Sequence, residues 1–88
     1  MKGISQTRQF LKDLRRMQKR GKNPYKLQQV VTLLAHGERL PEKYRDHALT
    51  GPWEGTRDCH VEPDWILLYT LDENLLCLER TGTHSDLF

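Results

Sequence analysis

One run of the chain, Trp65 to Leu71 (WILLYTL), most restricts the folds that this sequence can adopt. Its apolar residues follow one another without alternating with polar ones, and turn-forming segments bound it at residues 62–64 and 72–74. A strand of this composition needs cover on much of both faces. We therefore predict that residues 65–71 form the central strand of a sheet.

Two further runs, Thr56 to Val61 and Leu75 to Thr81, have strand composition and are joined to the central run by short turns. Turns this short connect antiparallel neighbours. The sequence thus predicts an antiparallel meander, to which Lys2 to Ser5 are expected to add a short edge strand.

Two helices are predicted before the strands. The first lies within residues 6–20 and ends near Gly21, and the second begins at Asn23 and Pro24, a typical N-cap followed by proline, and ends near Gly37. Both have an apolar stripe of helical period that should pack on the sheet. The stripe residues are Phe10, Leu11, Leu14 and Met17 in the first helix and Leu27, Val30, Val31 and Leu34 in the second.

A chain of 88 residues has room for one small core, so residues 1–88 are expected to form a single α+β domain with the helix hairpin on one face of the sheet. No apolar run approaches the length of about 20 residues that spans a bilayer, and no signal-peptide core precedes the first helix. A cytoplasmic protein without a membrane partner is expected. Cys59 and Cys77 lack a CxxC spacing and are expected to be reduced.

The charge is unevenly distributed. Residues 1–47 contain 12 Lys and Arg against 4 Asp and Glu, whereas residues 48–88 contain 2 against 8. A basic half favours a polyanionic partner such as RNA, although a basic helix face is equally consistent with simple solvation. Charge alone does not decide between them.

Strand register predicts where polar side chains meet. If the first turn centres on Glu62 and Pro63, His60 lies opposite Trp65; if the second centres on residues 72–74, Asp64 falls opposite about Gly82, two residues before His84. His60, Asp64 and His84 should therefore lie close together at one end of the sheet. Register does not place His47, which falls in an irregular segment, residues 40–53.

Each of these residues also has a structural explanation. A single histidine is usually a surface or core residue, Asp64 is typical turn chemistry, and Thr83 with Asp86 resembles a capping box. Trp53 and Trp65 are more typical of packing than of base stacking. Three histidines with an aspartate also suggest zinc, but no two of them have a compact ligand spacing.

The cluster has a chemical use in RNA cleavage. Imidazoles can supply a neutral base and a protonated acid together near neutral pH. The base would remove the proton from a ribose 2′-hydroxyl, the acid would protonate the departing 5′-oxygen, and Arg57 or Arg80 could stabilise charge on the phosphate. No metal and no cofactor is expected.

Two segments, DHALTGPWEGTRDCHVEPDWILLY and LERTGTHSDLF, resemble the YafQ branch of the RelE-like bacterial toxins, which are ribosome-dependent endoribonucleases of type II toxin–antitoxin systems. The resemblance implies two N-terminal helices on a small twisted antiparallel sheet and cleavage of mRNA in the ribosomal A site. It places the catalytic set on His47, His60, Asp64 and His84, and adds Trp65 and Phe88 as residues that shape the site and hold the nucleotide. Of the histidines, His47 and His84 are the favoured proton-transfer pair, without an assignment of base and acid.

The resemblance also implies partners: the 70S ribosome, a cognate antitoxin, and operator DNA only through the antitoxin complex. The basic residues expected to contact ribosomal RNA are Arg15, Arg16, Lys19, Arg20, Lys22 and Lys26. Two other functions stay open, namely a noncatalytic ribosome- or antitoxin-binding module and a gyrase poison related to ParE, because related scaffolds host different functions.

Overall fold

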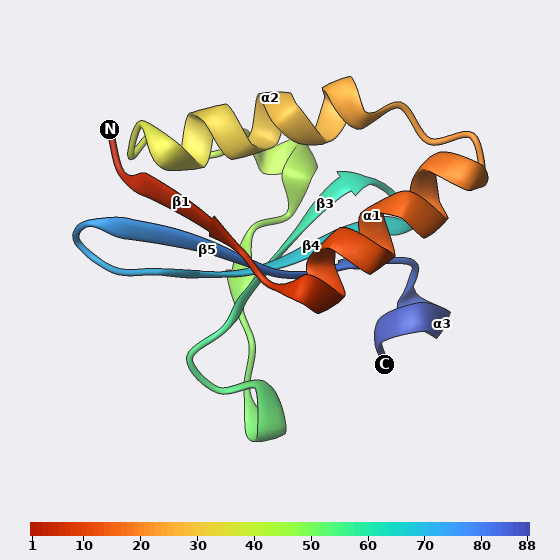
Figure 1. Ribbon diagram of the computed structural model, residues 1–88. Coiled ribbons are helices and arrows are strands. Elements are labelled where there is room, and N and C mark those ends of the chain that lie inside the picture. Colours follow the sequence, from red (N-terminus) through yellow and green to blue (C-terminus); the bar gives the residue numbers. More distant parts are fainter.

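The computed structural model describes residues 1–88 as a five-stranded sheet covered by two long helices on one face (Figure 1). The strands have the order β1-β5-β4-β3-β2, which puts β4 at the centre as predicted. No helix has the length and apolar character needed to cross a membrane. The strands are β1 (Gly3–Gln6), β2 (His47–Ala48), β3 (Arg57–Glu62), β4 (Trp65–Leu71) and β5 (Leu75–Gly82), and the α-helices are α1 (Arg8–Lys19), α2 (Pro24–Ala35) and α3 (His84–Leu87).

The sheet is not entirely antiparallel, which corrects the prediction at one edge. Strands β2 to β5 pair in antiparallel fashion, but β1 pairs with β5 in parallel, Gly3 opposite Leu75 and Gln6 opposite Leu78. The parallel pair arises because the helix hairpin and the meander intervene between these two strands, whereas neighbours joined by short turns must run antiparallel.

Strand register also differs from the prediction, because both hairpins contain an irregularity. Between His60 and Glu62 the register shifts, so Glu62 pairs with Trp65 and His60 pairs with Ile66. A second shift between Leu68 and Tyr69 places Gly82 opposite Ile66. Since a shift of one residue moves a side chain to the other face, the first irregularity decides which face His60 occupies.

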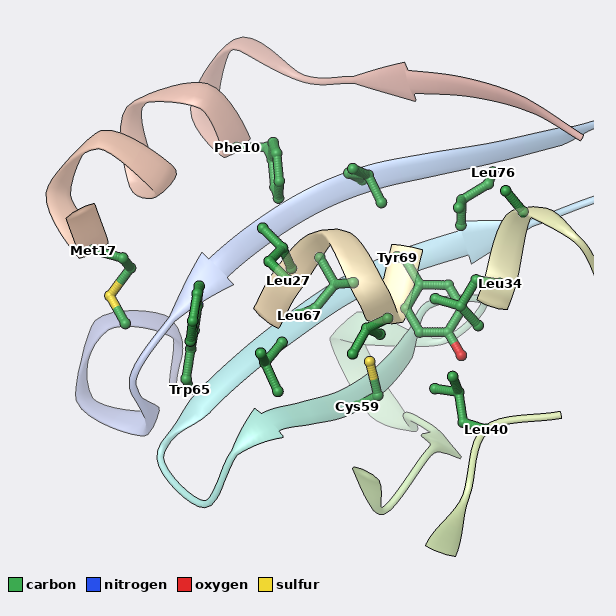
Figure 2. Close-up of a cluster of buried hydrophobic side chains, with 14 residues drawn as sticks. Phe10, Met17, Leu27, Leu34, Leu40, Cys59, Trp65, Leu67, Tyr69 and Leu76 are labelled. Atoms are coloured by element: carbon green, nitrogen blue, oxygen red, sulfur yellow. The ribbon is translucent and has the colours of Figure 1, made fainter. Parts of the chain in front are cut away.

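The helix-facing side of the sheet holds the main core (Figure 2). Thr7 caps α1 and Asn23 caps α2, each side chain accepting a backbone N–H of the first turn. Both apolar stripes pack inward as predicted, except that Leu11 is exposed. The core residues contributed by the helices are Phe10, Met17, Leu27, Val30, Leu34 and Ala35, and those contributed by the strands include Cys59, Val61, Trp65, Leu67, Tyr69, Leu76 and Leu78.

The opposite side of the sheet carries a smaller apolar cluster. Ile66 and Leu68 are buried there under Leu87 of α3, with Leu49 and Trp53 packed against them. In Figure 1 α3 lies beside the end of the sheet, and the segment with β2 extends on the side away from α1 and α2. We call this side, defined by Ile66 and Leu68, the open face.

Candidate active site

All three candidate histidines are associated with the open face. His47 pairs with Asp58 in register, and Asp58 pairs in turn with Leu68 of the open face. His60 follows two residues later, opposite Ile66. His84 begins α3, and its ring lies 6.0 Å from the ring of His60. The structure thus brings together histidines from three separate elements.

Asp64 and His84 are neighbours, as register had indicated. The Asp64 carboxylate accepts the backbone N–H of His84 at 3.0 Å, and its Oδ1 lies 3.8 Å from Nδ1 of the His84 ring. The predicted proximity of His60, Asp64 and His84 is therefore confirmed, whereas their catalytic role stays a prediction. The His84 side chain is 65% exposed and so can reach a ligand on the surface.

Asp58 is a member of this site that sequence reasoning missed. Its residue is 3% exposed, its Oδ1 makes no hydrogen bond, and that oxygen lies 3.4 Å from Nε2 of His60. Burial raises the pKa of Asp58, and the charges of His47, His60 and His84 act in the opposite direction. The signal available in the sequence was its spacing from His60, because residues two apart in a strand share a face.

Two histidines have one ring nitrogen held by a carbonyl oxygen. Nδ1 of His47 lies 2.7 Å from the carbonyl oxygen of Arg45, and Nδ1 of His60 lies 3.0 Å from that of Pro63. A carbonyl can only accept, so in each ring Nδ1 carries the proton. Nε2 of His47 is then available for chemistry, whereas Nε2 of His60 lies 3.4 Å from Oδ1 of Asp58. If Nε2 of His60 carries no proton, its lone pair and the Asp58 carboxylate repel each other. One additional proton, either on Nε2 or on the carboxylate, removes this repulsion.

Phe88 lies at the edge of the cluster. Its ring is 5.6 Å from the His84 ring and makes an edge-on contact with Trp53 at 6.1 Å. It is 54% exposed. An exposed aromatic face beside the histidines is suited to stacking on a nucleobase.

Trp65 is buried beneath the site and is not exposed at its surface. It is 0% exposed, lies in the helix-facing core, and donates its indole N–H to Thr81 Oγ1 at 2.8 Å. As the first residue of β4 it supports the end of the sheet beneath the site. Because side chains alternate along β4, Trp65 and Ile66 face opposite sides of the sheet. The role predicted for Trp65, to shape the site and hold the nucleotide, stays a prediction.

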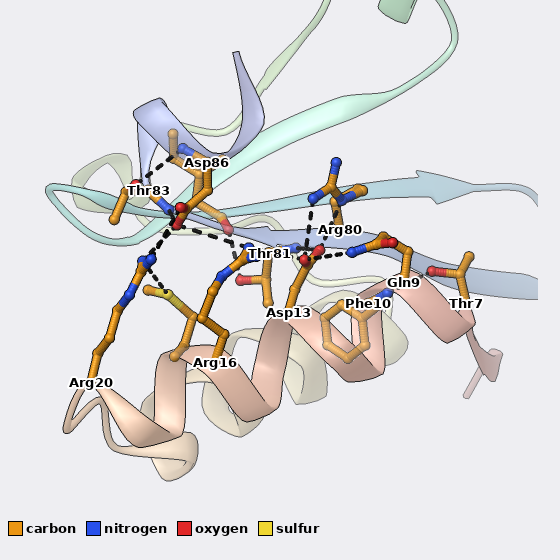
Figure 3. A network of polar contacts seen from close by, with 12 residues as sticks. Thr7, Gln9, Phe10, Asp13, Arg16, Arg20, Arg80, Thr81, Thr83 and Asp86 are labelled. Atoms are coloured by element: carbon orange, nitrogen blue, oxygen red, sulfur yellow. Dashed lines mark hydrogen bonds and ion pairs between the residues drawn. The ribbon is translucent and has the colours of Figure 1, made fainter.

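The two candidate phosphate-binding arginines are also engaged elsewhere. Arg57 pairs with Tyr69 of the helix-facing core, and its guanidinium binds Asp46, whose carboxylate also accepts the hydroxyl of Tyr69. The Arg57 guanidinium is therefore engaged by Asp46, the residue before His47. Arg80 pairs in register with Leu68 of the open face, but its Nε donates to Asp13 at 2.8 Å (Figure 3).

The basic residues of the hairpin are partly neutralised. Lys22 and Lys26 both contact Glu62 at 2.7 Å, Arg16 contacts Asp13 at 3.0 Å, and Arg20 contacts Asp86 at 2.7 Å. Of the six residues expected to bind ribosomal RNA, Arg15 and Lys19 make no ion pair within the chain. They are the cations most available to an external phosphate.

A groove of about 390 Å³ begins at His60 and runs between α2 and the segment that precedes β2. Lys26, Lys43 and Arg45 line it together with Glu62. Lys43 and Arg45 were not among the predicted binding residues, because nothing in the irregular segment indicated their direction. No group of three or more His, Cys, Asp or Glu side chains has the arrangement of a metal site.

Known proteins are similar to this chain in sequence and architecture. The family described as the bacterial toxin of type II toxin–antitoxin system, YafQ, matches residues 2–88. The mRNA interferase toxin YafQ of Escherichia coli strain K12 is 51% identical over 86 residues, which are 97% of this chain and 94% of that protein. The crystal structure of YafQ from E. coli strain BL21(DE3) has a TM-score of 0.94 at 48% identity and covers 100% of this chain and 99% of that one. A chain of the E. coli DinJ–YafQ complex has a TM-score of 0.92 at 49% identity, with the same coverage. The protein therefore belongs to the YafQ family of bacterial toxins of type II toxin–antitoxin systems.

Proposed function

We propose that this protein is a ribosome-dependent endoribonuclease that cleaves mRNA in the ribosomal A site and so inhibits translation. The observation that carries the proposal is the convergence of His47, His60 and His84 on the open face. The similar E. coli protein is named an mRNA interferase toxin, which supports the same reaction class. The exposed ring of Phe88, in edge-on contact with Trp53, offers an unpaired base a surface for stacking at the edge of the site.

The reaction is a transesterification within the RNA. A base takes the proton from the ribose 2′-hydroxyl, the 2′-oxygen bonds to phosphorus, the bond from phosphorus to the 5′-oxygen breaks, and an acid protonates that oxygen. The products are a 2′,3′-cyclic phosphate and a free 5′-hydroxyl, with no water consumed. These steps need one proton acceptor and one proton donor and no redox change.

Ring surroundings divide these roles between His47 and His84. The proton on Nδ1 of His47 points to a carbonyl, so its Nε2 lone pair is available as the base. We assign the acid to His84, because Nδ1 of its ring lies 3.8 Å from Oδ1 of Asp64 and that carboxylate can orient the ring. His60, with Nδ1 at the Pro63 carbonyl and Nε2 beside Asp58, is held in a fixed orientation next to His84.

The experiment is cleavage of a defined mRNA bound to 70S ribosomes by EDTA-treated protein at controlled magnesium. We expect cuts in A-site codons that are lost in His47→Ala and His84→Ala. The matched control is His36→Ala, which removes an exposed histidine at the C-cap of α2 and should cleave normally. Wild-type protein that binds ribosomes without cutting would instead favour the noncatalytic binding module.

Binding to ribosomal RNA is proposed to begin at the hairpin, with Arg15 and Lys19 as free cations. Replacement of both by Glu should weaken co-sedimentation with ribosomes, and the loss should grow as salt rises, because the phosphate contacts release counterions. Unchanged co-sedimentation would remove the hairpin from the interface. By analogy with the E. coli DinJ–YafQ complex, a cognate antitoxin is proposed to bind this chain, and operator DNA is reached only through that complex.

A further inference from the structure

The helix that carries His84 is too short to hold its own position. Helix α3 has four residues, and a single turn is unstable in isolation. Its place must come from contacts made by its side chains. His84 starts this helix and Phe88 follows it, so any motion of α3 moves both residues of the open face.

Asp86 is the most connected side chain of α3. Its carboxylate receives two N–H bonds from the Arg20 guanidinium, 2.7 Å to Oδ2 and 3.2 Å to Oδ1, and a third from the backbone of Thr83 at 2.9 Å (Figure 3). Two parallel bonds of this kind fix orientation as well as distance. The hydrogen bonds from Arg20 and Thr83 hold the pKa of Asp86 well below its usual range.

Arg20, the partner of Asp86 in this contact, is held in place by its own helix. Arg20 is the C-cap of α1, and the preceding Met17 is fully buried in the main core. The strand end leading into α3 is equally tight, because a Cβ on Gly82 would meet the Asp86 side chain at 3.0 Å. Leu87 adds an apolar contact on the open face. The Arg20–Asp86 pair is thus the closest polar link between α3 and the helix layer, and Arg16 Nη2 lies farther from the same carboxylate, 4.0 Å from Oδ2.

We propose that Arg20 and Asp86 form a clamp that holds α3 and thereby positions His84 and Phe88 for RNA cleavage. This inference rests on the proposed function, and it makes Arg20 a positioning residue in addition to a member of the basic face. Arg20 lies at the C-terminal end of α1, where the helix hairpin turns, so the clamp joins α3 to that end of the helix. Arg20, which its charge had placed among the expected ribosome contacts, therefore also sets the positions of His84 and Phe88.

The clamp is tested first in the free protein, without RNA. Arg20→Ala removes the pair and leaves the capping box of α3 intact, whereas Asp86→Asn keeps an acceptor for Thr83 and loses the charge. We expect the NMR order parameters of residues 84–87 to fall from about 0.85 to below about 0.6 in both variants. The matched control is Lys12→Ala, which removes an exposed cation from α1 and should leave them unchanged.

Single-turnover cleavage at varied ribosome concentration gives the second readout. At saturating ribosomes the rate should fall about threefold to tenfold in Arg20→Ala and Asp86→Asn, as expected for the loss of a partly exposed charge pair. Asp86→Asn should not raise the ribosome concentration at half-maximal rate, because it removes no cation. The double variant should be no slower than the slower single variant, and Arg20→Lys should recover part of the rate.

Unchanged order parameters in Arg20→Ala, or a full saturating rate in both variants, would overturn the clamp. A loosened α3 in a protein whose wild type never cleaves RNA would support the clamp and overturn only the proposed function.

Discussion

Asp13 allows the strongest test of how the fold is held together. It is 0% exposed, and its carboxylate accepts from Arg80 Nε at 2.8 Å, Arg16 at 3.0 Å, Gln9 at 3.0 Å and the backbone of Thr81 at 3.3 Å. Asp13→Ala removes this anion from beneath two arginines. Loss of one partner of a buried ion pair costs about 3–5 kcal/mol, a large part of the roughly 5–15 kcal/mol that stabilises a typical domain.

Thermal unfolding followed by circular dichroism measures this loss. For a domain of this size each kcal/mol lowers Tm by about 4–8 °C, so Asp13→Ala should melt at least about 12 °C below the wild type. The matched control is Glu54→Ala, an exposed acid with no ion pair, which should change Tm little. A decrease below about 4 °C for Asp13→Ala would refute the view that this network holds α1 against β5.

The pH dependence of thermal stability shows whether the ionised form of Asp13 stabilises the fold. Burial raises the pKa of Asp13, but hydrogen bonds from Arg80 and Gln9 outweigh it and the pKa lies below the usual value. Its stabilisation is therefore present above the unfolded pKa of about 3.9 and is lost as pH falls through the folded pKa. The difference in Tm between wild type and Asp13→Asn should shrink below about pH 4.

Other predictions concern the site and its surroundings. Asp58→Asn should raise Tm by roughly 4 °C at pH 8 but not at pH 3 in thermal melting curves. Burial raises the pKa of Asp58, so the cost of burying its charge appears only as pH rises. An equal change in Tm at both pH values would contradict this reasoning. Trp65→Phe should lower the free energy of unfolding in urea by about 1–3 kcal/mol, because the hydrogen bond to Thr81 is lost, while the folded protein keeps its cleavage rate. A loss of cleavage rate without a loss of stability would instead indicate that Trp65 contacts the nucleotide. Glu62→Gln should tighten ribosome binding at low salt by releasing Lys22 and Lys26, and co-sedimentation as weak as the wild type would show that neither lysine meets RNA.

Periodicity sufficed for the helices and for the central strand. The apolar spacing of α1 and α2, the cap at Asn23 and the unbroken run of β4 are local signals, and the structure confirms all of them. The terminal capping box of Thr83 and Asp86 is present as well. Each of these features is decided by residues within one or two turns of one another.

Features that depend on distant partners were not predictable in this way. Strand β2 has two residues, and its pairing with β3 is what brings His47 opposite Asp58. The irregularity after His60 has no sequence mark, yet it moves that histidine to the open face. Asp86 was recognised as a cap, but its bond to Arg20, 66 positions away, follows only from tertiary packing.

The two faces of the sheet separate the residues that determine folding from those proposed for catalysis, so selection can change the two properties independently. Along β3, Cys59 and Val61 lie in the core that determines whether the chain folds, and Asp58 and His60, which alternate with them, lie with the candidate catalytic groups. A deep mutational scan of residues 58–61, which precede the shifted pairing of Glu62, should consequently divide by parity, with odd positions limiting abundance and even positions limiting toxicity at normal abundance. Variants that lose toxicity yet accumulate normally would map the chemistry of the site residue by residue.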